Sequence, residues 1–353
     1  MSLARYLLKL VGVRILAALA VLVGILEILD LLEVTTEILN RRLGIAGVLH
    51  YALLRLPRLI EQAAPLAALA GSLFAFSKLA GESAVTAMRS TGVSAYRITL
   101  LALPAAATLA LAQLAIGQVI APRTDDALHT WWQSTAPPKQ PAKTDDPLTF
   151  RVGDQIVVAR LGDPDARRLV DVSIYLRDAT GRLVQRTTAQ AAVYDGSGWQ
   201  LVAPQFETIS AAAVQTGGAE RMTWAQKLRP AEILALTAEQ PTVTPAAARR
   251  ALAGGVAIRP RSFYDTQVQR AWAGPLACMV MLLLAAPAAL AHLRGGGATL
   301  LVQCLGAGLL FMVVDGAFTA LGESGAAPAF LAAWAAPTMF AALGISALLY
   351  MEG

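Results

Sequence analysis

The sequence predicts an α-helical membrane protein with six transmembrane helices, three on each side of an inserted antiparallel β-jelly-roll domain. Hydrophobic residues make up 56% of the 353 residues and charged residues only 15%, whereas a soluble globular domain carries about 25% charged residues. Apolar runs of about 20 residues or more, long enough to cross a bilayer, fall into two groups of three. Between these groups lies a polar region of short alternating segments, a pattern typical of half-buried strands.

The first three spans are expected at about residues 11–32, 53–79 and 95–121. No small-residue cleavage site follows the first run, so we expect a retained span rather than a signal peptide. The basic side chains near the start of the chain favour a cytoplasmic N-terminus by the positive-inside rule. Three crossings then place the polar region outside the cytoplasm, and three more return the C-terminus to it. The basic side chains are Arg5, Lys9 and Arg14.

Residues 123–240 are expected to form the β domain, after a linker marked by Pro137, Pro138 and Pro141. Turn signals such as Gly153 and Gly217-Gly218 separate the candidate strands. These strands are expected at 148–152, 155–161, 169–177, 183–194, 199–209 and 221–228. Their inward side chains are suited either to a filled sandwich core or to a groove for acyl chains. The residues expected to face inward are Val157, Val170, Val172, Ile174, Val193 and Leu201.

Connecting helices and three further spans complete the chain. One or two surface helices are expected between Pro230 and Asp265, and they include the connecting segment 241–264 with a helix-start signal at Thr244-Pro245. The last three spans are expected at about 271–293, 300–321 and 329–350. The predicted domains are therefore residues 1–122, 123–240, 241–264 and 265–353.

Several function classes are disfavoured by what the sequence lacks. Its basic residues are scattered beside apolar runs without aromatic interleaving, which fits membrane flanks better than nucleic-acid binding. It has no Gly-x-x-x-x-Gly-Lys-Ser/Thr loop, so ATP would have to be bound by another chain. Cys278 and Cys304 lie in apolar runs without zinc-site spacing, and no His-Glu-x-x-His motif occurs. We therefore expect a protein that is not itself an enzyme and that binds no metal or cofactor.

The short polar stretch Leu79–Val93 lies between two apolar runs. Glu82 falls in the first turn of a candidate helix at residues 81–92, and Gly92 stands where a C-terminal glycine cap belongs. Two interpretations stay open: an ordinary interfacial turn, or a helix offered to a soluble partner. In the second interpretation, the contact residues would be Glu82, Ala84, Val85, Met88 and Arg89.

An acidic stripe lies near the outer end of the first span. Its members are spaced by three or four residues and therefore share one face of a helix. The stripe is either a solvated helix end or a gate-side surface that faces a lipid headgroup or basic residues of a partner. The stripe consists of Glu27, Asp30, Glu33 and Glu37.

Three other charged groups near the spans are candidates for a role. Asp315 is a lone acid in an apolar run, and such a group is expected to face a partner or a cavity. Arg123, just beyond the third span, has the geometry to pair with a lipid phosphate through two hydrogen bonds. Arg58 and Glu61 are one turn apart and are expected to neutralise each other.

The layout and several motifs resemble the LptF/LptG permease family of Gram-negative bacteria. Residues 79–93 are similar to that family's coupling helix, with Met88 and Gly92 in register. Segments 29–33 and 148–154 are closer to the LptG branch. This sequence departs from the family at three places. The family's coupling acid aligns with Ala84, Glu27 stands where some members have a lysine, and family arginines fall on His129 and Trp132. The later spans resemble the family at Pro275–Pro287, Phe311-x-x-x-Asp315 and Pro328…Trp334-x-x-Pro337.

The resemblance implies a multi-pass permease of the bacterial inner membrane, with cytoplasmic termini and a periplasmic β domain. An LptF-like and an LptG-like permease pair, and each binds an LptB-like ATPase that holds ATP and Mg. The complex would extract lipopolysaccharide from the outer leaflet of the inner membrane through a lateral gate between the first and fifth spans. LptC-like and LptA-like periplasmic proteins would then receive the lipid by edge-strand pairing of similar β domains.

Two functions of other classes compete with this one. The first is a non-transporting scaffold whose β domain docks partners. The second is a secondary transporter built from three-span repeats, which is disfavoured because the two halves show no convincing internal similarity. Co-purification with a soluble ATPase that responds to changes at Glu82 or Met88 would separate the permease from the scaffold.

Overall fold

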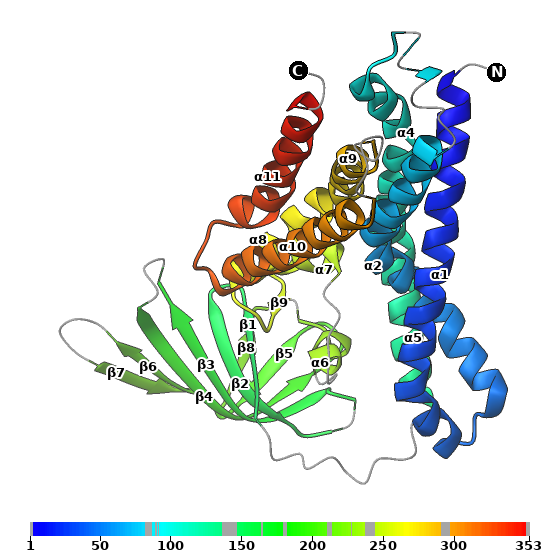
Figure 1. The fold of residues 1–353 in the computed structure, drawn as a ribbon. Helices are drawn as coiled ribbons and strands as arrows, with labels where there is room; N and C mark the ends of the chain where they lie inside the picture. Colours follow the sequence, from blue (N-terminus) through cyan, green and yellow to red (C-terminus); the bar gives the residue numbers. More distant parts are fainter. Residues whose placement is uncertain are drawn as a thin grey trace. The chain divides into compact units, whose positions relative to one another are not determined.

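The chain forms two compact units in the computed structural model. The first consists of residues 1–137 and 266–353, and the second of residues 138–265. The first unit is helical and the second contains one antiparallel sheet (Figure 1). The residues described are 3–81, 87–88, 90, 92–135, 147–163, 165–178, 182–209, 214–226, 228–236, 244–290 and 297–350.

Helices α1 (Leu3–Asn40) and α2 (Gly44–Gly81) are each 38 residues long and pack as an antiparallel pair. At 1.5 Å per residue each is about 57 Å long, well beyond the roughly 30 Å of hydrocarbon in a bilayer. The predicted spans covered only the more apolar parts of these helices. Hydropathy identifies the residues that favour a lipid environment, whereas the hydrogen-bonded helix also includes the polar residues at both ends.

Small residues allow α1 and α2 to approach closely. A Cβ atom built on Gly71 would lie 2.6 Å from the backbone nitrogen of Ile15 and 2.9 Å from the carbonyl carbon of Arg14. Such close approach is typical of helix pairs in membranes, where packing replaces the hydrophobic effect as the main source of stability. On α1, the residues buried along this contact are one turn apart: Leu7, Val11 and Ile15.

The third span continues beyond its predicted end. Helix α4 (Ala95–Ala115) passes through a π-helical turn, η1 (Ile116–Ile120), into α5 (Ala121–Ser134). Pro122 therefore does not end the helix, because it falls in the first turn of α5, where a missing N–H costs little. The Thr124 hydroxyl donates to the carbonyl oxygens of Ile120, at 3.3 Å, and Ala121, at 3.1 Å. The helix thus occupies residues 123–134, which were expected to begin the β domain.

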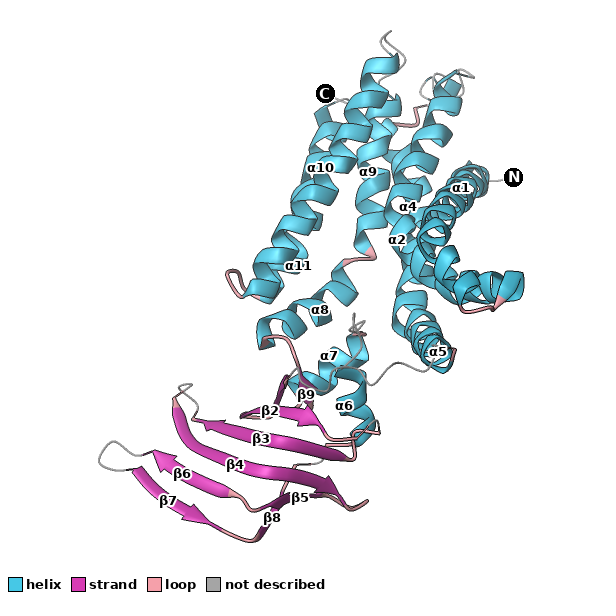
Figure 2. Cartoon of the chain, turned by 90° about the horizontal axis from the view of Figure 1, so that it is seen from below, coloured by secondary structure: helices cyan, strands magenta, loops and turns pink. Residues whose placement is uncertain are grey.

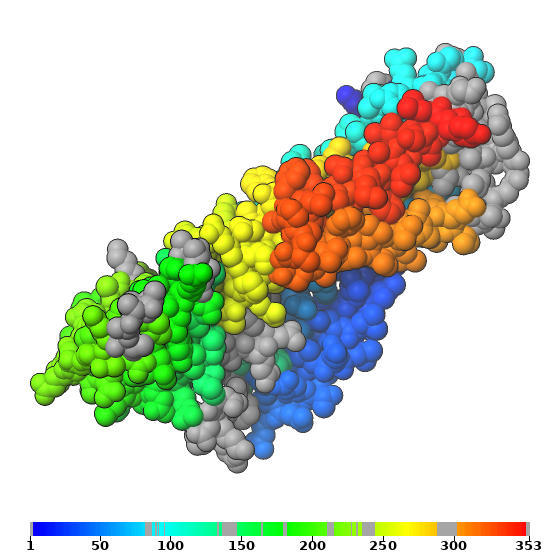
Figure 3. Space-filling model, turned by 90° about the vertical axis from the view of Figure 1, so that its left-hand side faces the viewer, coloured from blue at the N-terminus to red at the C-terminus, as the bar shows by residue number. Residues whose placement is uncertain are grey.

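The C-terminal part of the helical unit contains a bent pair and two straight spans. Helices α8 (Arg261–Ala273) and α9 (Leu276–Leu290) meet at an angle of 53° around Gly274-Pro275. Helices α10 (Gly297–Ser324) and α11 (Ala329–Tyr350) lie side by side (Figure 3). Among the described helices, five are long and apolar enough to cross a membrane, or six if the bent pair counts as one span.

The sheet is antiparallel throughout and branches at its longest strand (Figure 2). Its main order is β7-β6-β4-β3-β2-β1-β9. Strand β4 pairs with β6 along one half and with β5 along the other, and β8 extends β5. The strands are β1 (Leu148–Val152), β2 (Gln155–Leu161), β3 (Arg168–Arg177), β4 (Leu183–Tyr194), β5 (Trp199–Val202), β6 (Gln205–Ile209), β7 (Val214–Gly218), β8 (Arg221–Trp224) and β9 (Val256–Ala257).

Three predicted features of the β domain were wrong. The expected strand 199–209 is broken, because Ala203 has a φ of +49° and Pro204 has no N–H for the ladder. Gly217 was expected in a turn but lies in strand β7. A Cβ atom at this position would lie 2.6 Å from the Cζ atom of Phe206 on the neighbouring strand. Strand β9, which pairs with β1, was expected to be part of a helix.

The two connecting helices agree with the sequence pattern. They are α6 (Pro230–Leu236) and α7 (Pro245–Leu252). The predicted helix start at Thr244 is confirmed, because its hydroxyl oxygen accepts a hydrogen bond from the backbone N–H of Ala247 at 3.1 Å.

Buried side chains of the sheet domain form one hydrophobic cluster. Trp199 is fully buried, and its indole N–H donates to the carbonyl oxygen of Leu228 at 2.8 Å. The predicted inward residues are buried except Val170, which is half-buried, and Val193, which is 40% exposed. Asp171 has a φ of +51°, which turns β3 so that Leu169 faces the core in place of Val170.

Candidate functional site

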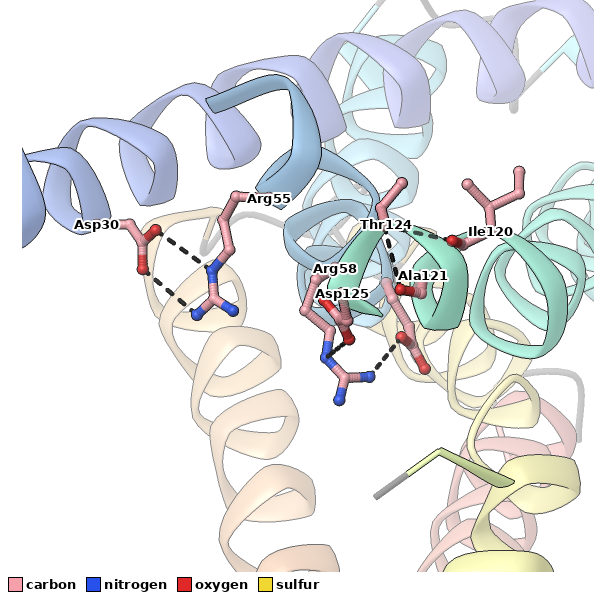
Figure 4. Close-up of polar contacts among 8 residues, drawn as sticks. Asp30, Arg55, Arg58, Ile120, Ala121, Thr124 and Asp125 are labelled. Carbon is pink, nitrogen blue, oxygen red and sulfur yellow. Dashed lines mark hydrogen bonds and ion pairs between the residues drawn. The ribbon is translucent and has the colours of Figure 1, made fainter. Parts of the chain in front are cut away.

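A cluster of charged and polar side chains joins α1, α2 and α5, and we call it the polar layer: Asp30, Tyr51, Arg55, Arg58, Glu61 and Asp125. Asp30 accepts a hydrogen bond from the Tyr51 hydroxyl at 2.8 Å, and its Oδ2 lies 3.3 Å from Arg55 Nε. Figure 4 shows Asp30 turned from α1 towards Arg55 on α2. Asp30 is therefore paired with an arginine of the same chain.

Arg58 forms the other half of the polar layer. Its Nη1 lies 3.0 Å from Glu61 Oε2, which confirms the predicted pair, and its Nε lies 3.8 Å from Asp125 Oδ2 (Figure 4). The Asp125 side chain is only 4% exposed. Asp125 was not predicted, because the residues after Pro122 were expected to lie outside the helical unit.

The four members of the predicted acidic stripe have different surroundings. Both carboxylate oxygens of Glu27 are buried without a hydrogen-bond partner among the described residues. Glu33 is exposed, and Glu37 pairs with Arg41 one turn later in the chain. The members of the stripe thus differ in burial and in partner, although they share one helix.

Aromatic side chains fasten the α1–α2 turn to α5. The Arg41 guanidinium lies over the Trp132 ring, 3.9 Å from its centroid, and donates to the Trp132 carbonyl oxygen at 2.7 Å. The rings of His50 and Trp131 are 5.0 Å apart. The two tryptophans therefore hold helices together. Arg123, on the same helix, is exposed.

A proline in α2 creates a polar link between three helices. Pro65 has no N–H, so the carbonyl oxygen of Glu61 lacks its usual partner in the helix. The Gln113 side-chain amide of α4 donates to this oxygen at 3.0 Å. The Cys278 thiol of α9 in turn donates to Gln113 Oε1 at 3.1 Å. Gln113 thereby satisfies a backbone group that would otherwise be unpaired in a membrane-spanning segment.

We expect Gln113→Leu to lower the free energy of unfolding by about 1–3 kcal/mol, because it leaves a buried carbonyl oxygen unpaired. The unfolding midpoint of the purified protein in detergent measures this effect. Pro65→Ala is the matched control, since it restores an N–H for Glu61. Gln113→Leu should cost less in a Pro65→Ala background, and an equal cost in both backgrounds would contradict the assigned bond.

A second polar cluster surrounds α8 and contains Asp315. Arg270 Nη2 lies 2.9 Å from Asp315 Oδ2, and the Trp334 indole N–H donates to Gln269 Oε1 at 3.3 Å. Gln267 donates to Glu323 Oε1 at 2.8 Å. Asp315 therefore has a partner within this chain, as a lone acid in an apolar run requires. Arg270 was not predicted as this partner, although it precedes the apolar run of the neighbouring span.

Four residues of the predicted coupling segment lie outside the described residues: Glu82, Ala84, Val85 and Arg89. Met88 is half-buried and packs against the core of the helical unit. The predicted glycine cap is confirmed, because Gly92 has a φ of +83° and the Val93 N–H donates to the Met88 carbonyl oxygen at 3.0 Å.

The predicted gate residues thus do not form one cluster in the described part of the chain. Glu27 and Asp30 lie on α1, with Asp30 paired to α2, whereas Asp315 on α10 pairs with α8. Arg123 belongs to neither cluster. Asp30–Arg55 therefore joins α1 to α2, and Arg270–Asp315 joins α8 to α10.

Comparison with known proteins agrees with the motif analysis. The family model of the lipopolysaccharide export system permease LptF/LptG matches residues 5–350. The chain is also similar to the lipopolysaccharide export system permease protein LptG of Haemophilus influenzae, with 26% identity over 238 residues. That match covers 67% of this chain and 66% of the relative's length. The resemblance to the LptG branch is therefore confirmed, and the chain belongs to the LptF/LptG family of lipopolysaccharide export permeases.

Proposed function

We propose that this chain is the permease subunit of an ATP-driven lipopolysaccharide exporter. The observation that carries the proposal is the family match along residues 5–350, on a chain whose sheet domain is inserted between two groups of apolar helices. The bent pair α8–α9 crosses the membrane as one span and gives six spans in total. Both termini are cytoplasmic, and the sheet domain is a periplasmic jelly roll that receives the lipid.

The two ion pairs suggest how the gate works. Asp30–Arg55 fastens α1 to α2, and Arg270–Asp315 fastens α10 to α8. We expect the gate to open between α1 and α10, with both ion pairs intact. Large apolar side chains are exposed on both helices, as an acyl chain or a partner permease requires: Val21, Ile28 and Leu32 on α1, and Val302, Leu309 and Val313 on α10.

The energy for this movement comes from another subunit. An LptB-like ATPase dimer that holds ATP and Mg binds at residues 81–92, and Glu82 and Arg89 set the register of that contact. An LptF-like permease completes the membrane part, and LptC-like and LptA-like proteins continue the sheet in the periplasm. A scaffold without transport would need the sheet domain but no ATPase.

The proposal requires the sheet domain and residue 87 to lie on opposite sides of the inner membrane. We expect a membrane-impermeant maleimide to label Ala219→Cys in spheroplasts and Ala87→Cys only after lysis. Both positions are exposed alanines, and the two native cysteines are buried, so background labelling should be low. Labelling of Ala219→Cys only after lysis would place the sheet domain in the cytosol and contradict the proposal.

A further inference from the structure

A cleft of about 270 Å³ lies between the N-terminal part of α1 and the C-terminal end of α2. Three of the six side chains that line it are basic, and the described lining residues include no acid. Such a concentration of positive charge in one cleft attracts an anionic group. The lining residues are Tyr6, Lys9, Leu10, Val13, Arg14 and Lys78.

The packing of α1 against α2 brings these cations together. The close contact at Gly71 fixes α2 against the backbone of Arg14 and Ile15. Lys78 lies two helical turns beyond Gly71 and on the same face of α2. Because the helices are antiparallel, Lys78 reaches the level of Lys9. Arg14 Nη1 donates to the carbonyl oxygen of Leu10 at 3.4 Å, so its charge is directed towards the same end of the bundle.

The surroundings of the cleft suit a lipid better than a soluble anion. Val13 is 57% exposed and Leu16, one turn further into the span, is 60% exposed. Tyr6, at the mouth of the cleft, is 41% exposed and has the amphipathic ring typical of a membrane interface. The cleft is therefore basic at the end of the span and continues into an apolar surface that faces the bilayer.

We propose that this cleft binds an anionic glycerophospholipid of the surrounding bilayer. Its phosphodiester lies against Lys9, Arg14 and Lys78, and its acyl chains lie along Val13 and Leu16. The bound lipid would hold the end of α1 against α2. Assigning it to the cytoplasmic leaflet rests on the proposed function, whereas the binding itself does not.

The cleft is separate from the path proposed for lipopolysaccharide. Lys9 and Asp30 are about 21 residues apart on α1, which corresponds to about 32 Å of helix. That distance is close to the thickness of the hydrocarbon layer. The cleft and the polar layer thus lie at opposite surfaces of the membrane, so a lipid in the cleft is not the exported substrate at its gate.

Lipid binding to the full-length protein tests the proposal. Dioleoyl phosphatidylglycerol and dioleoyl phosphatidylcholine, which differ only in the headgroup, are titrated in mixed micelles, and bound lipid is counted by native mass spectrometry. We expect selective binding of phosphatidylglycerol. Each basic residue near a membrane surface contributes about 1 kcal/mol, so Lys9→Gln with Lys78→Gln should weaken binding about 30-fold. Arg14→Lys, which keeps the charge, should retain it.

Arg97→Gln is the matched control, because Arg97 is an exposed cation at the start of α4 and does not line the cleft. It should bind phosphatidylglycerol like the wild type. Equal binding of the two lipids, or unchanged binding by the Lys9→Gln/Lys78→Gln variant, would overturn the proposal. Displacement of the lipid by glycerol 3-phosphate would also overturn it, because a soluble phosphate would then be the ligand. Failure of lipopolysaccharide export with intact phosphatidylglycerol selectivity would contradict only the proposed function.

Discussion

Gly71→Leu is expected to prevent the accumulation of folded protein. The hydrogen of Gly71 faces the backbone of α1, and a Cβ atom there would lie 2.6 Å from the nitrogen of Ile15. Backbone atoms cannot rotate away as a side chain does, so the helices must separate. Separation would disrupt the buried contacts of Leu7, Val11 and Ile15 with α2. Overpacking of a well-packed core costs about 1–3 kcal/mol, and a leucine against backbone should exceed this range.

The prediction is measured as the yield of monodisperse protein in size-exclusion chromatography and as the unfolding midpoint in detergent. Gly71→Ala should retain some folded protein with a lowered midpoint. Gly24→Leu is the control, because a Cβ on Gly24 of the same α1–α2 pair meets nothing within 4 Å. Wild-type yield and midpoint for Gly71→Leu would show that α1 and α2 do not pack at Gly71.

Arg270→Ala is expected to lower the free energy of unfolding by about 2–3 kcal/mol, because it leaves Asp315 ionised and unpaired in a membrane span. Both side chains keep partial access, with 30% of Arg270 and 20% of Asp315 exposed. The cost should therefore lie below that of breaking a fully buried pair. The unfolding midpoints of the single and double variants measure it.

Exchange of the two charges provides a direct check of the pairing. Arg270→Asp and Asp315→Arg should each destabilise the protein, and the double variant should recover part of the loss. Arg261→Ala is the control on the same helix, because its pair with Asp265 is 3.8 Å long and largely exposed and should contribute little. Additive effects of Arg270→Asp and Asp315→Arg would mean that the two side chains do not interact.

Local patterns predicted the elements whose limits depend on nearby residues. Strands β1, β2 and β4 and helix α11 occur at the predicted residues, because turn residues and changes of periodicity mark both ends of each. Helix α5 was not predicted, because Pro122 is a helix-end signal in sequence but is tolerated after the π-turn. Strand β9 was not predicted either, since two residues carry no periodicity and become a strand only beside β1.

For two ion pairs of the candidate site, Asp30–Arg55 and Arg270–Asp315, only the acidic member was predicted. The sequence indicated Asp30 and Asp315 as acids that need partners, but not Arg55 and Arg270, which lie far away along the chain. Pairing across helices depends on rotation and depth, and neither follows from hydropathy. The hydrogen bond of Gln113 is a different case. Pro65 in the sequence indicates that a carbonyl oxygen one turn earlier lacks its helical partner, but only the fold shows which donor reaches that oxygen.

The two ion pairs have a consequence for the proposed exporter. In the proposed mechanism, the gate between α1 and α10 opens while Asp30–Arg55 and Arg270–Asp315 stay intact, so no charge has to be exposed to lipid during the movement. Variants that loosen either pair should therefore reduce stability first and export only as a result. Positions on the exposed faces of α1 and α10 should affect export without a change in stability.

The most direct test of the account is transfer of lipopolysaccharide from proteoliposomes to a soluble LptA-like acceptor. The vesicles contain this chain, an LptF-like permease and the LptB-like ATPase that we expect to co-purify with them. We predict that transfer requires ATP. Glu82→Lys should lower both ATPase activity and transfer at least tenfold. Glu220→Lys, on an exposed turn of the sheet domain, is the control and should leave both unchanged. Assembly without an ATPase, or equal transfer with and without ATP, would contradict the account and favour a scaffold.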